Sequence, residues 1–264
     1  LFTPEFSDMG CVNIDDPYGA RLFESSQIPV VSVSRTNKKA TWHYVKTEIS
    51  GRGYDIAIRG SGGILIEGEL PLVGAHNLDN ALLAIALAVE SGVDPVAISA
   101  DLSKLRGPAG RLERVDLGQN FLALVDYAHT PDAVERVLQA LREISTGRVI
   151  AVLGCGGDRD ASKRPLMGSA LVSGSDVAIM TSDNPRSEDP EEILRQMQGD
   201  HELSSSLIVE ADRRGAIAIA VAEASSGDIV VLLGKGHENG QDINGIKNPF
   251  DDRVELARAI ERLS

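Results

Sequence analysis

The chain has 264 residues, enough for two modest domains or one large domain. Hydrophobic residues make up 42% and charged residues 25%, as in ordinary globular proteins, while aromatic residues at 4% leave the core to Ala, Val, Ile and Leu. The net charge of −13 argues against nucleic-acid binding, which normally needs a basic face. Small anionic ligands stay possible, because a few local arginines can bind them.

Cysteine content and apolar runs bear on the compartment in which the protein works. The two cysteines, Cys11 and Cys155, are far apart and form no CxxC pattern, so neither a disulfide framework nor a structural zinc site is expected. The longest apolar run, residues 81–89, is about half of the ~18 residues that a membrane helix needs. No signal peptide is recognisable. We therefore expect a cytoplasmic protein without membrane insertion.

The first part of the chain mixes strand and helix patterns. Between Trp42 and Leu72, apolar and polar residues alternate and glycines interrupt them, which predicts antiparallel hairpins. An Ala- and Leu-rich stretch that ends at Gly92 predicts a helix. The elements expected here are a strand at 11–14, a turn at 15–19, a helix at 20–25, strands at 29–34, 44–49, 54–59 and 63–70, and helices at 77–90 and 95–105.

A flexible joint, residues 106–110, predicts a boundary between domains at 1–109 and 110–264. After it, strands alternate with helices of about 10–15 residues, which predicts an open parallel sheet with helices on both faces. The whole chain is therefore expected to be α/β. The elements expected after the joint are strands at 121–126, 148–153, 176–181, 206–210 and 228–233, and helices at 132–145, 163–173, 191–198, 214–224 and 252–263.

Polar and charged residues follow each strand expected after the joint. The segments are 126–132, 154–160, 183–186, 212–214 and 234–238. In a parallel sheet the carboxyl ends of the strands share one edge, where ligands bind. Loop polarity explains any one segment, but all of them together favour a site for a small charged molecule. Arg159 and Arg186 can hold carboxylates, while Asp183 and Glu238 can hold ammonium groups, so a zwitterion fits.

Other ligand motifs do not fit the sequence. Residues 154–159 lack the third glycine of the dinucleotide-binding fingerprint. Gly234-Lys235-Gly236 is not a phosphate-binding Walker A loop, because neither Ser nor Thr follows the lysine. The five histidines show no HxxxH or HxH spacing, so the sequence predicts no metal site.

The ordered set of motifs resembles the Mur ligases of the MurE type over nearly the whole chain. The motifs are Gly74–Asn80, Gly110–Glu113, Asp126–Asp132, Gly154–Asp160 followed by Lys163-Arg164-Pro165, Asp183–Arg186 and Gly234–Glu238. The resemblance implies an ATP- and Mg²⁺-dependent ligase. Such a ligase adds an amino acid to UDP-N-acetylmuramoyl-L-alanyl-D-glutamate (UDP-MurNAc-L-Ala-D-Glu) through an acyl phosphate, in peptidoglycan synthesis. It also implies that residues 1–109 are the C-terminal part of a central ATP-binding domain and that residues 110–264 form a Rossmann-like amino-acid-binding domain.

Six residues match nucleotide-binding and catalytic positions of that family. They are Asn77 and Asn80 for adenine, Asp126 for the ribose, Arg111 and His129 for the terminal phosphates, and Lys163 as a cation of the closed site. Of these, Arg111, His129 and Lys163 are the expected catalytic residues. Without the resemblance, helix capping and surface solvation would explain the same side chains.

Six further residues match the family's amino-acid-binding positions. They are Arg159, Asp183, Asn184, Arg186, Gly234 and Glu238. Arg186 is the discriminating one, because the far end of meso-diaminopimelate carries a carboxylate that lysine lacks and an arginine can bind it bidentately. Lysine-adding relatives usually have a small residue there. The resemblance therefore implies meso-diaminopimelate as substrate, although Arg186 could instead cap the loop after Pro185.

The family's P-loop, its magnesium ligands, its carbamylated lysine and its uridine-nucleotide-binding domain have no counterpart in this sequence. In the family they precede a segment like Leu1-Phe2-Thr3-Pro4. We thus expect a piece of a longer, monomeric protein that cannot ligate by itself. A lysine-adding MurE, a MurF or folylpolyglutamate relative, and a non-catalytic module that binds amino acids or nucleotides remain alternatives.

Overall fold

The computed structural model describes residues 1–50 and 53–263. It divides the chain into two compact units, Leu1–Arg106 and Gly107–Ser264. The division falls within the joint expected at 106–110, at residue 106 rather than 109.

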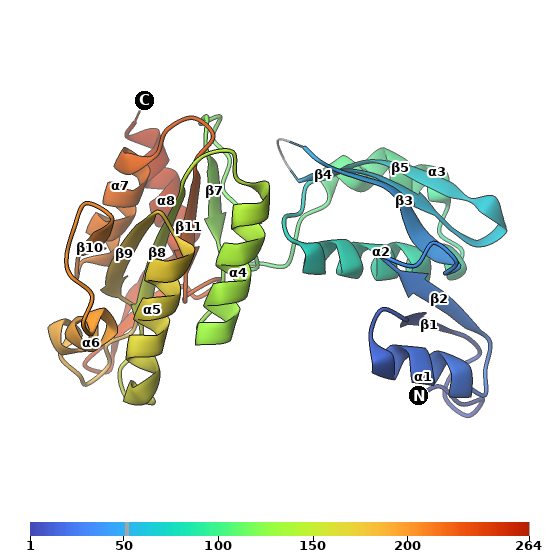
Figure 1. Ribbon diagram of the computed structural model, residues 1–264, viewed down its shortest axis with the longest axis horizontal. Helices are drawn as coiled ribbons and strands as arrows, with labels where there is room; N and C mark the ends of the chain where they lie inside the picture. The colour runs from blue at the N-terminus through green and yellow to red at the C-terminus, as the bar shows by residue number, and fades with distance from the viewer. Residues whose placement is uncertain (51–52, 264) are drawn as a thin grey trace. The chain divides into compact units, whose positions relative to one another are not determined.

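The first unit contains a five-stranded sheet in the order β1-β2-β3-β4-β5 (Figure 1). Its strands are β1 (Gly10–Asn13), β2 (Val30–Ser34), β3 (Trp42–Ile49), β4 (Tyr54–Arg59) and β5 (Leu65–Leu70). β1, β2 and β3 pair in parallel, whereas β3–β4 and β4–β5 are antiparallel. The predicted hairpins are therefore confirmed.

Three helices accompany this sheet: α1 (Pro17–Ser25), α2 (Ala75–Glu90) and α3 (Pro95–Asp101). Short 3₁₀ turns lie at Ser61–Gly63 and Leu102–Lys104. The apolar side of α2, with Leu82 and Ile85, packs on a core that contains the fully buried Trp42. The prediction that α1 begins at residue 20 is wrong. Asp16 accepts hydrogen bonds from the first backbone amides and Pro17 starts the helix, so it begins three residues earlier.

The second unit contains a six-stranded sheet in the order β10-β9-β8-β11-β7-β6. Its strands are β6 (Glu113–Arg114), β7 (Leu122–Val125), β8 (Val149–Cys155), β9 (Val177–Ser182), β10 (Leu207–Val209) and β11 (Ile229–Leu233). All neighbours are parallel except β6 and β7. The parallel sheet is as predicted, and the two-residue edge strand β6 is an addition.

Helices cover both faces of this sheet (Figure 1). They are α4 (Pro131–Ile144), α5 (Arg164–Gly174), α6 (Pro190–Gln198), α7 (Arg213–Glu223) and α8 (Asp252–Glu261), with a 3₁₀ turn at Ala161–Lys163 before α5. α7 and α8 pack on one face through Ile217, Val221 and Leu256, and α4, α5 and α6 lie on the other. Strands buried on both faces explain the apolar runs that predicted them.

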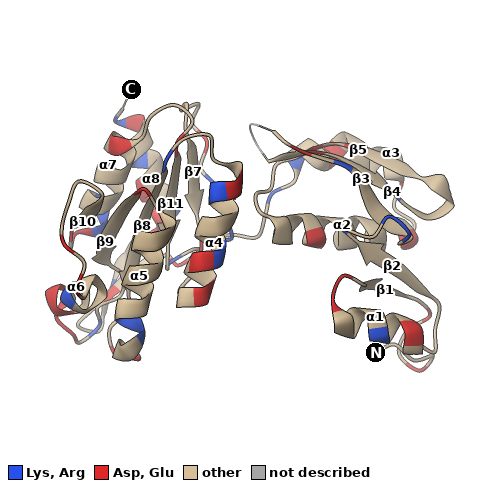
Figure 2. Ribbon diagram, viewed as in Figure 1, with Lys and Arg blue, Asp and Glu red and all other residues tan. Residues whose placement is uncertain are grey.

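The charged residues of the second unit lie mostly outside this core, on helices and loops. Figure 2 shows that acidic residues occur on many elements of both units and are not confined to a single element. In the described part of the chain, no helix is both long and apolar enough to pass through a membrane.

A short antiparallel hairpin follows β11 and was not predicted. It consists of β12 (Gly240–Ile243) and β13 (Ile246–Pro249), joined by Asn244 and Gly245. Both turn residues have positive φ, 53° and 76°, as a tight two-residue hairpin turn requires. Ile243 forms a parallel bridge with Arg186, so the hairpin supports the loop after β9.

Candidate functional site

A cavity of about 410 Å³ lies at the carboxyl ends of the strands of the second unit. The loops after β7, β8, β9 and β11 contribute to it. Its lining residues are Tyr127, His129, Thr130, Gly154, Cys155, Gly156, Arg159, Asp160, Lys163, Arg164, Met167, Asp183, Asn184, Arg186, Gly234 and Glu238. The structure thus brings together all six residues predicted for the amino acid, together with His129 and Lys163.

The strand order explains why the cavity forms here. From β8 the chain continues to its neighbour β9, on one side. β11 is the neighbour of β8 on the other side, and the chain continues from β11 to α8, which contacts β7. Connections that diverge in this way open a crevice at the carboxyl ends of neighbouring strands.

The loop that carries Arg186 is held from two sides. Gly157 N–H donates to the Asn184 carbonyl at 2.8 Å, and a Cβ on Gly157 would lie 1.9 Å from the Pro185 oxygen. On the other side, Arg186 N–H donates to the Asp242 carbonyl at 3.0 Å and the Arg186 carbonyl accepts from Asn244 at 2.7 Å. These bonds stabilise Arg186 at φ 51°, a conformation uncommon for residues other than glycine.

Arg164 ties the loop after β8 to the same segment. Its guanidinium is almost fully buried and donates to both Glu188 carboxylate oxygens, at 2.7 and 2.8 Å, and to the Gly156 carbonyl at 3.3 Å. Hydrogen bonds from Arg164 and from the Asp158 amide lower the pKa of Glu188 to about 2. The carboxylate therefore stays ionised and keeps both loops together at physiological pH.

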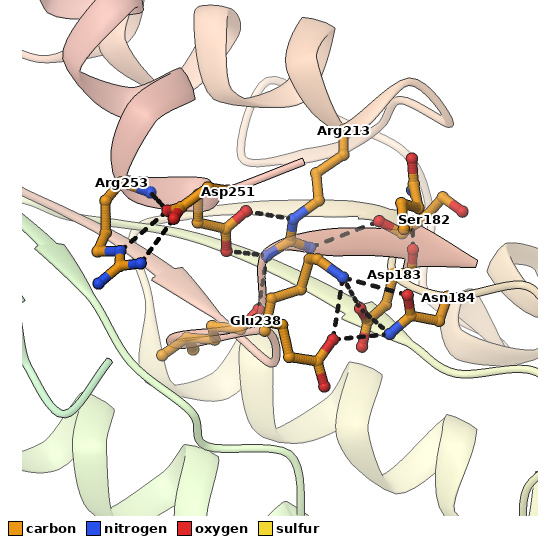
Figure 3. Close-up of polar contacts among 11 residues, drawn as sticks. Ser182, Asp183, Asn184, Arg213, Glu238, Asp251 and Arg253 are labelled. Atoms are coloured by element: carbon orange, nitrogen blue, oxygen red, sulfur yellow. Dashed lines mark hydrogen bonds and ion pairs between the residues drawn. The ribbon is translucent and has the colours of Figure 1, made fainter. Parts of the chain in front are cut away.

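The acidic end of the cavity combines Asp183, Asn184 and Glu238 (Figure 3). Asn184 Nδ2 donates to Glu238 Oε2 at 2.9 Å and to Asp183 Oδ1 at 3.2 Å. Burial raises the pKa of Asp183, although Lys235 and Arg213 oppose this. Burial also acts on Glu238, but the Asn184 amide and Lys235 outweigh it, so the Glu238 pKa lies below its usual value. Lys235, which sequence reasoning had not selected, is completely buried beneath these groups.

A buried ion pair lies next to the acidic end, and Figure 3 labels its arginine, Arg213. Arg213 Nε and Nη2 donate to Asp252 at 2.8 and 2.6 Å, and both side chains are fully buried. Arg213 also donates to the carbonyls of Leu233 at 3.0 Å and Ser182 at 3.5 Å, the last residues of β11 and β9. The pair therefore joins the two strand ends that precede the acidic residues.

The loop after β10 corrects one prediction. Residues 212–214 were expected on the ligand-binding edge, but none of them lines the cavity. Asp212 caps α7, Arg213 points into the core, and Arg214 pairs with Glu255 at 2.7 Å. Because β10 is the outermost strand of the sheet, its following loop lies away from the crevice.

Cationic and aromatic side chains gather beside the cavity around Tyr127. The Arg111 guanidinium carbon lies 5.1 Å from the centre of the Tyr127 ring. The rings of His129 and His237 lie 4.6 and 5.3 Å from it. Arg111 and both histidines are exposed, which suits contact with an anionic ligand.

Asp126, Asn77 and Asn80, which were predicted to contact the nucleotide, do not line the cavity. The buried Asp126 carboxylate accepts hydrogen bonds from the amides of Leu112 and Ala128, both at 2.8 Å, and so holds the segment after Arg111. Asn77 and Asn80 lie on α2 of the first unit. The buried Asn77 amide donates to the Val73 carbonyl at 2.7 Å, and Asn80 is exposed. Their predicted nucleotide contacts stay predictions.

Cys155 lies in the cavity wall and should react slowly. Burial, with a smaller contribution from Asp183, raises the pKa of its thiol to about 12. At pH 8 the thiolate that reacts is therefore about 1,000-fold scarcer than for a free thiol with a pKa of about 8.5. In residues 1–264 with Cys11→Ser, we expect iodoacetamide to alkylate Cys155 at least about 10-fold more slowly than it alkylates N-acetylcysteine, because the greater nucleophilicity of a high-pKa thiolate offsets only part of its scarcity. Equal rates would contradict this environment for Cys155.

No group of three or more His, Cys, Asp or Glu side chains within residues 1–50 and 53–263 is placed to hold a metal ion.

Two family models match the chain. The model described as "Mur ligase middle domain" matches residues 2–88, and the one described as "Mur ligase, glutamate ligase domain" matches residues 110–236. The two matches fall in different units of the structure.

Curated relatives match nearly the whole chain. A Streptomyces coelicolor protein named UDP-N-acetylmuramoyl-L-alanyl-D-glutamate--2,6-diaminopimelate ligase is 47% identical over 99% of this chain and 53% of its own length. A protein of the same name from Aquifex aeolicus is 40% identical over 96% of this chain and 51% of its own length. The chain therefore spans about half the length of the relatives that it matches.

Solved structures show the same fold. A structure titled as the same 2,6-diaminopimelate ligase has a TM-score of 0.77 at 37% identity, covering 97% of this chain and 53% of its own. Mycobacterium tuberculosis folylpolyglutamate synthase has a TM-score of 0.62 at 21% identity, covering 99% of this chain and 57% of its own, which supports the fold alone.

Proposed function

This chain belongs to the Mur ligase family, and we propose that it forms half of an ATP-dependent ligase that adds meso-diaminopimelate to UDP-MurNAc-L-Ala-D-Glu. The names of its relatives support the reaction class and 2,6-diaminopimelate as the amino acid. On this proposal, residues 1–109 complete a central ATP-binding domain and residues 110–264 bind the amino acid.

One observation carries the proposal: the cavity combines cations and anions on neighbouring loops. Arg159 and Arg186 line it together with Asp183 and Glu238. The far end of meso-diaminopimelate carries a carboxylate and an ammonium group on one carbon, which can meet an arginine and a carboxylate at the same time. Lysine has only the ammonium group there. Arg186, whose loop is fastened to two neighbouring segments, is the residue that we assign to the carboxylate.

The residues of this chain have two tasks in the proposed reaction. ATP, when bound, supplies the phosphoryl group that activates the carboxylate of the peptide. The cavity residues then hold the amino acid so that its reacting amine faces the activated carbon, which lowers the entropic part of the barrier. Arg111, His129 and Lys163 are the cations that we assign to the charge developing on the phosphoryl oxygens.

The assignment of ATP to this chain rests on the exposed cluster around Tyr127, whose arginine and histidines fit a polyphosphate. Asn77, Asn80 and Asp126 complete the proposed nucleotide contacts. Mg²⁺ is proposed as the partner of the phosphates. Because the described residues offer no three-ligand group for it, we derive no step through the metal.

We further propose that the whole protein works as a monomer in the cytoplasm. The net charge of −13 of residues 1–264 argues against nucleic acid as a partner of this half.

The decisive test is ligation by the full-length protein with ATP, magnesium and UDP-MurNAc-L-Ala-D-Glu, comparing meso-diaminopimelate with lysine. We expect strong preference for meso-diaminopimelate. Preference for lysine would keep the ligase but overturn the role of Arg186. Activity with neither would favour a non-catalytic amino-acid-binding module. Residues 1–264 alone contain no Walker A sequence, so we expect them not to ligate, and amide formation by them would refute that expectation.

A further inference from the structure

Lys235 is a buried cation whose only described polar neighbours belong to the acidic end of the cavity. The described contacts of Nζ are with Asp183 Oδ1 at 3.2 Å, Asn184 Oδ1 at 3.2 Å and Glu238 Oε2 at 3.1 Å. Its side chain has no exposed surface. A buried lysine is uncommon and needs partners of opposite charge, which these are.

The backbone on both sides of Lys235 turns the side chain inward. Gly234 has φ 102° and Gly236 has φ 53°, conformations that favour glycine. A Cβ on Gly236 would lie 2.6 Å from Tyr127 Cβ. Two glycines in special conformations around one buried lysine indicate that the loop after β11 is shaped to place this ammonium group.

The charges around Lys235 do not cancel. Asp183 and Glu238 carry two negative charges when ionised, and Lys235 carries one positive charge in contact with both. Asn184 lies between the two carboxylates and donates to each, without adding charge. When both carboxylates are ionised, these three charged side chains leave the acidic end of the cavity with one negative charge, which matches a single ammonium group.

We propose that Lys235 is a positioning residue that holds Asp183 and Glu238 in place and leaves them with the one negative charge that an ammonium group of the substrate neutralises. The inference rests on the proposed function and deepens it, because it concerns how the same cavity selects the amino end of its amino acid. Lys235 itself is buried under the acceptors and acts through them.

The surroundings explain what the loss of Lys235 would do. Burial already raises the pKa of Asp183, and Lys235 is the largest effect against it. The other charged or titratable groups that face the pair are Arg213 with its partner Asp252, the Cys155 thiol, and Arg186 on the side of Glu238. Without Lys235, the buried Asp183 carboxylate and the partly exposed Glu238 carboxylate would repel each other, and the pKa of Asp183 would rise further. The protonated form, which cannot pair with an ammonium group, would then grow as the pH falls.

The experiment is the pH dependence of KM for meso-diaminopimelate in the full-length protein with Lys235→Met. We expect KM to rise about 30-fold or more at pH 6.5, since one partner of a buried charge pair is removed. KM should then fall as the pH rises to 8.5, while the wild-type value stays level. kcat and the KM values for ATP and the UDP-linked peptide should change little. Lys247→Met, which removes an exposed lysine of β13, is the matched control.

A second variant separates charge from packing. Lys235→Met combined with Asp183→Asn restores one net negative charge at the acidic end. It should therefore bind meso-diaminopimelate more tightly than Lys235→Met alone at pH 6.5 and lose the pH dependence. The double variant can also be measured if Lys235→Met alone does not fold. Its net charge at the acidic end equals that of the wild type, so it should fold more readily than the single variant.

Two results would overturn the role of Lys235 and leave the proposed function intact. One is a Lys235→Met protein with the wild-type KM at every pH. The other is a loss that is equal at every pH and that Asp183→Asn does not relieve. Failure of the wild-type protein to use meso-diaminopimelate would instead overturn the proposed function and this inference with it.

Discussion

Replacing Arg186 with alanine should lower kcat/KM for meso-diaminopimelate about 100-fold and leave kcat/KM for lysine unchanged. The guanidinium is assigned to the far carboxylate, and two charge-assisted hydrogen bonds are together worth about 3 kcal/mol, or about 100-fold. Lysine has no carboxylate at that end and loses nothing. The measurement is steady-state ligation by the full-length protein with each amino acid.

Two further variants sharpen this result. Arg186→Lys keeps the charge but not the planar fork, so it should recover only part of the activity. Arg195→Ala is the matched control, because Arg195 is an exposed arginine of α6 that pairs with Glu192 and does not line the cavity. If Arg186→Ala lowered kcat/KM for both amino acids equally, the role of Arg186 would be to support its loop, through Gly157 and the β12–β13 hairpin. It would then not select the substrate.

The edge of the sheet on which the site lies was predictable from sequence. Alternating strands and helices predict a parallel sheet, and its strand ends meet at one edge whatever the strand order. Arg159, Asp183, Arg186 and Glu238 could therefore be placed together before their neighbours in the sheet were known. The strand order was not predicted, so the loop after the edge strand β10 was wrongly counted with the others.

The sequence signal of the β12–β13 hairpin lies in its turn. Asn244-Gly245 is the dipeptide most typical of a two-residue hairpin turn, and both residues have the positive φ that this turn needs. The flanking strands are only four residues long, and β13 is exposed throughout while β12 is only partly buried, so their apolar pattern is weak. Turn chemistry was thus the better guide here than hydrophobic alternation.

The supporting cations could not be predicted from local patterns. Lys235 contacts Asp183 and Asn184 across 52 and 51 residues, and Arg213 meets Asp252 across 39 residues. Periodicity and propensity describe neighbours within a turn or a strand, and they say nothing of such pairs. In sequence, Lys235 looks like part of a glycine-rich loop and Arg213 like the start of a helix. Their burial, visible only in the fold, marks them as structural supports of the site.

Replacing Asp252 with asparagine should destabilise the second unit by about 3–5 kcal/mol, because the buried Arg213 charge keeps its place and loses its counter-ion. Urea unfolding followed by far-UV circular dichroism measures the change. Trp42, the only tryptophan of residues 1–264, lies in the first unit, so in this chain its fluorescence reports that unit separately. Glu192→Gln, in an exposed pair with Arg195, should cost no more than about 1 kcal/mol.

A charge-free double variant distinguishes the two effects of this ion pair. Arg213→Met with Asp252→Leu should regain part of the lost stability, since apolar residues of similar volume can replace a buried ion pair. It should still bind meso-diaminopimelate more weakly than the wild type, because the Ser182 and Leu233 carbonyls no longer have a donor that joins the ends of β9 and β11. Stability and affinity would then separate, as expected if Arg213 positions the strand ends that carry Asp183 and Lys235. An Asp252→Asn protein within about 1 kcal/mol of the wild type would contradict the expected cost of leaving the buried Arg213 without its counter-ion.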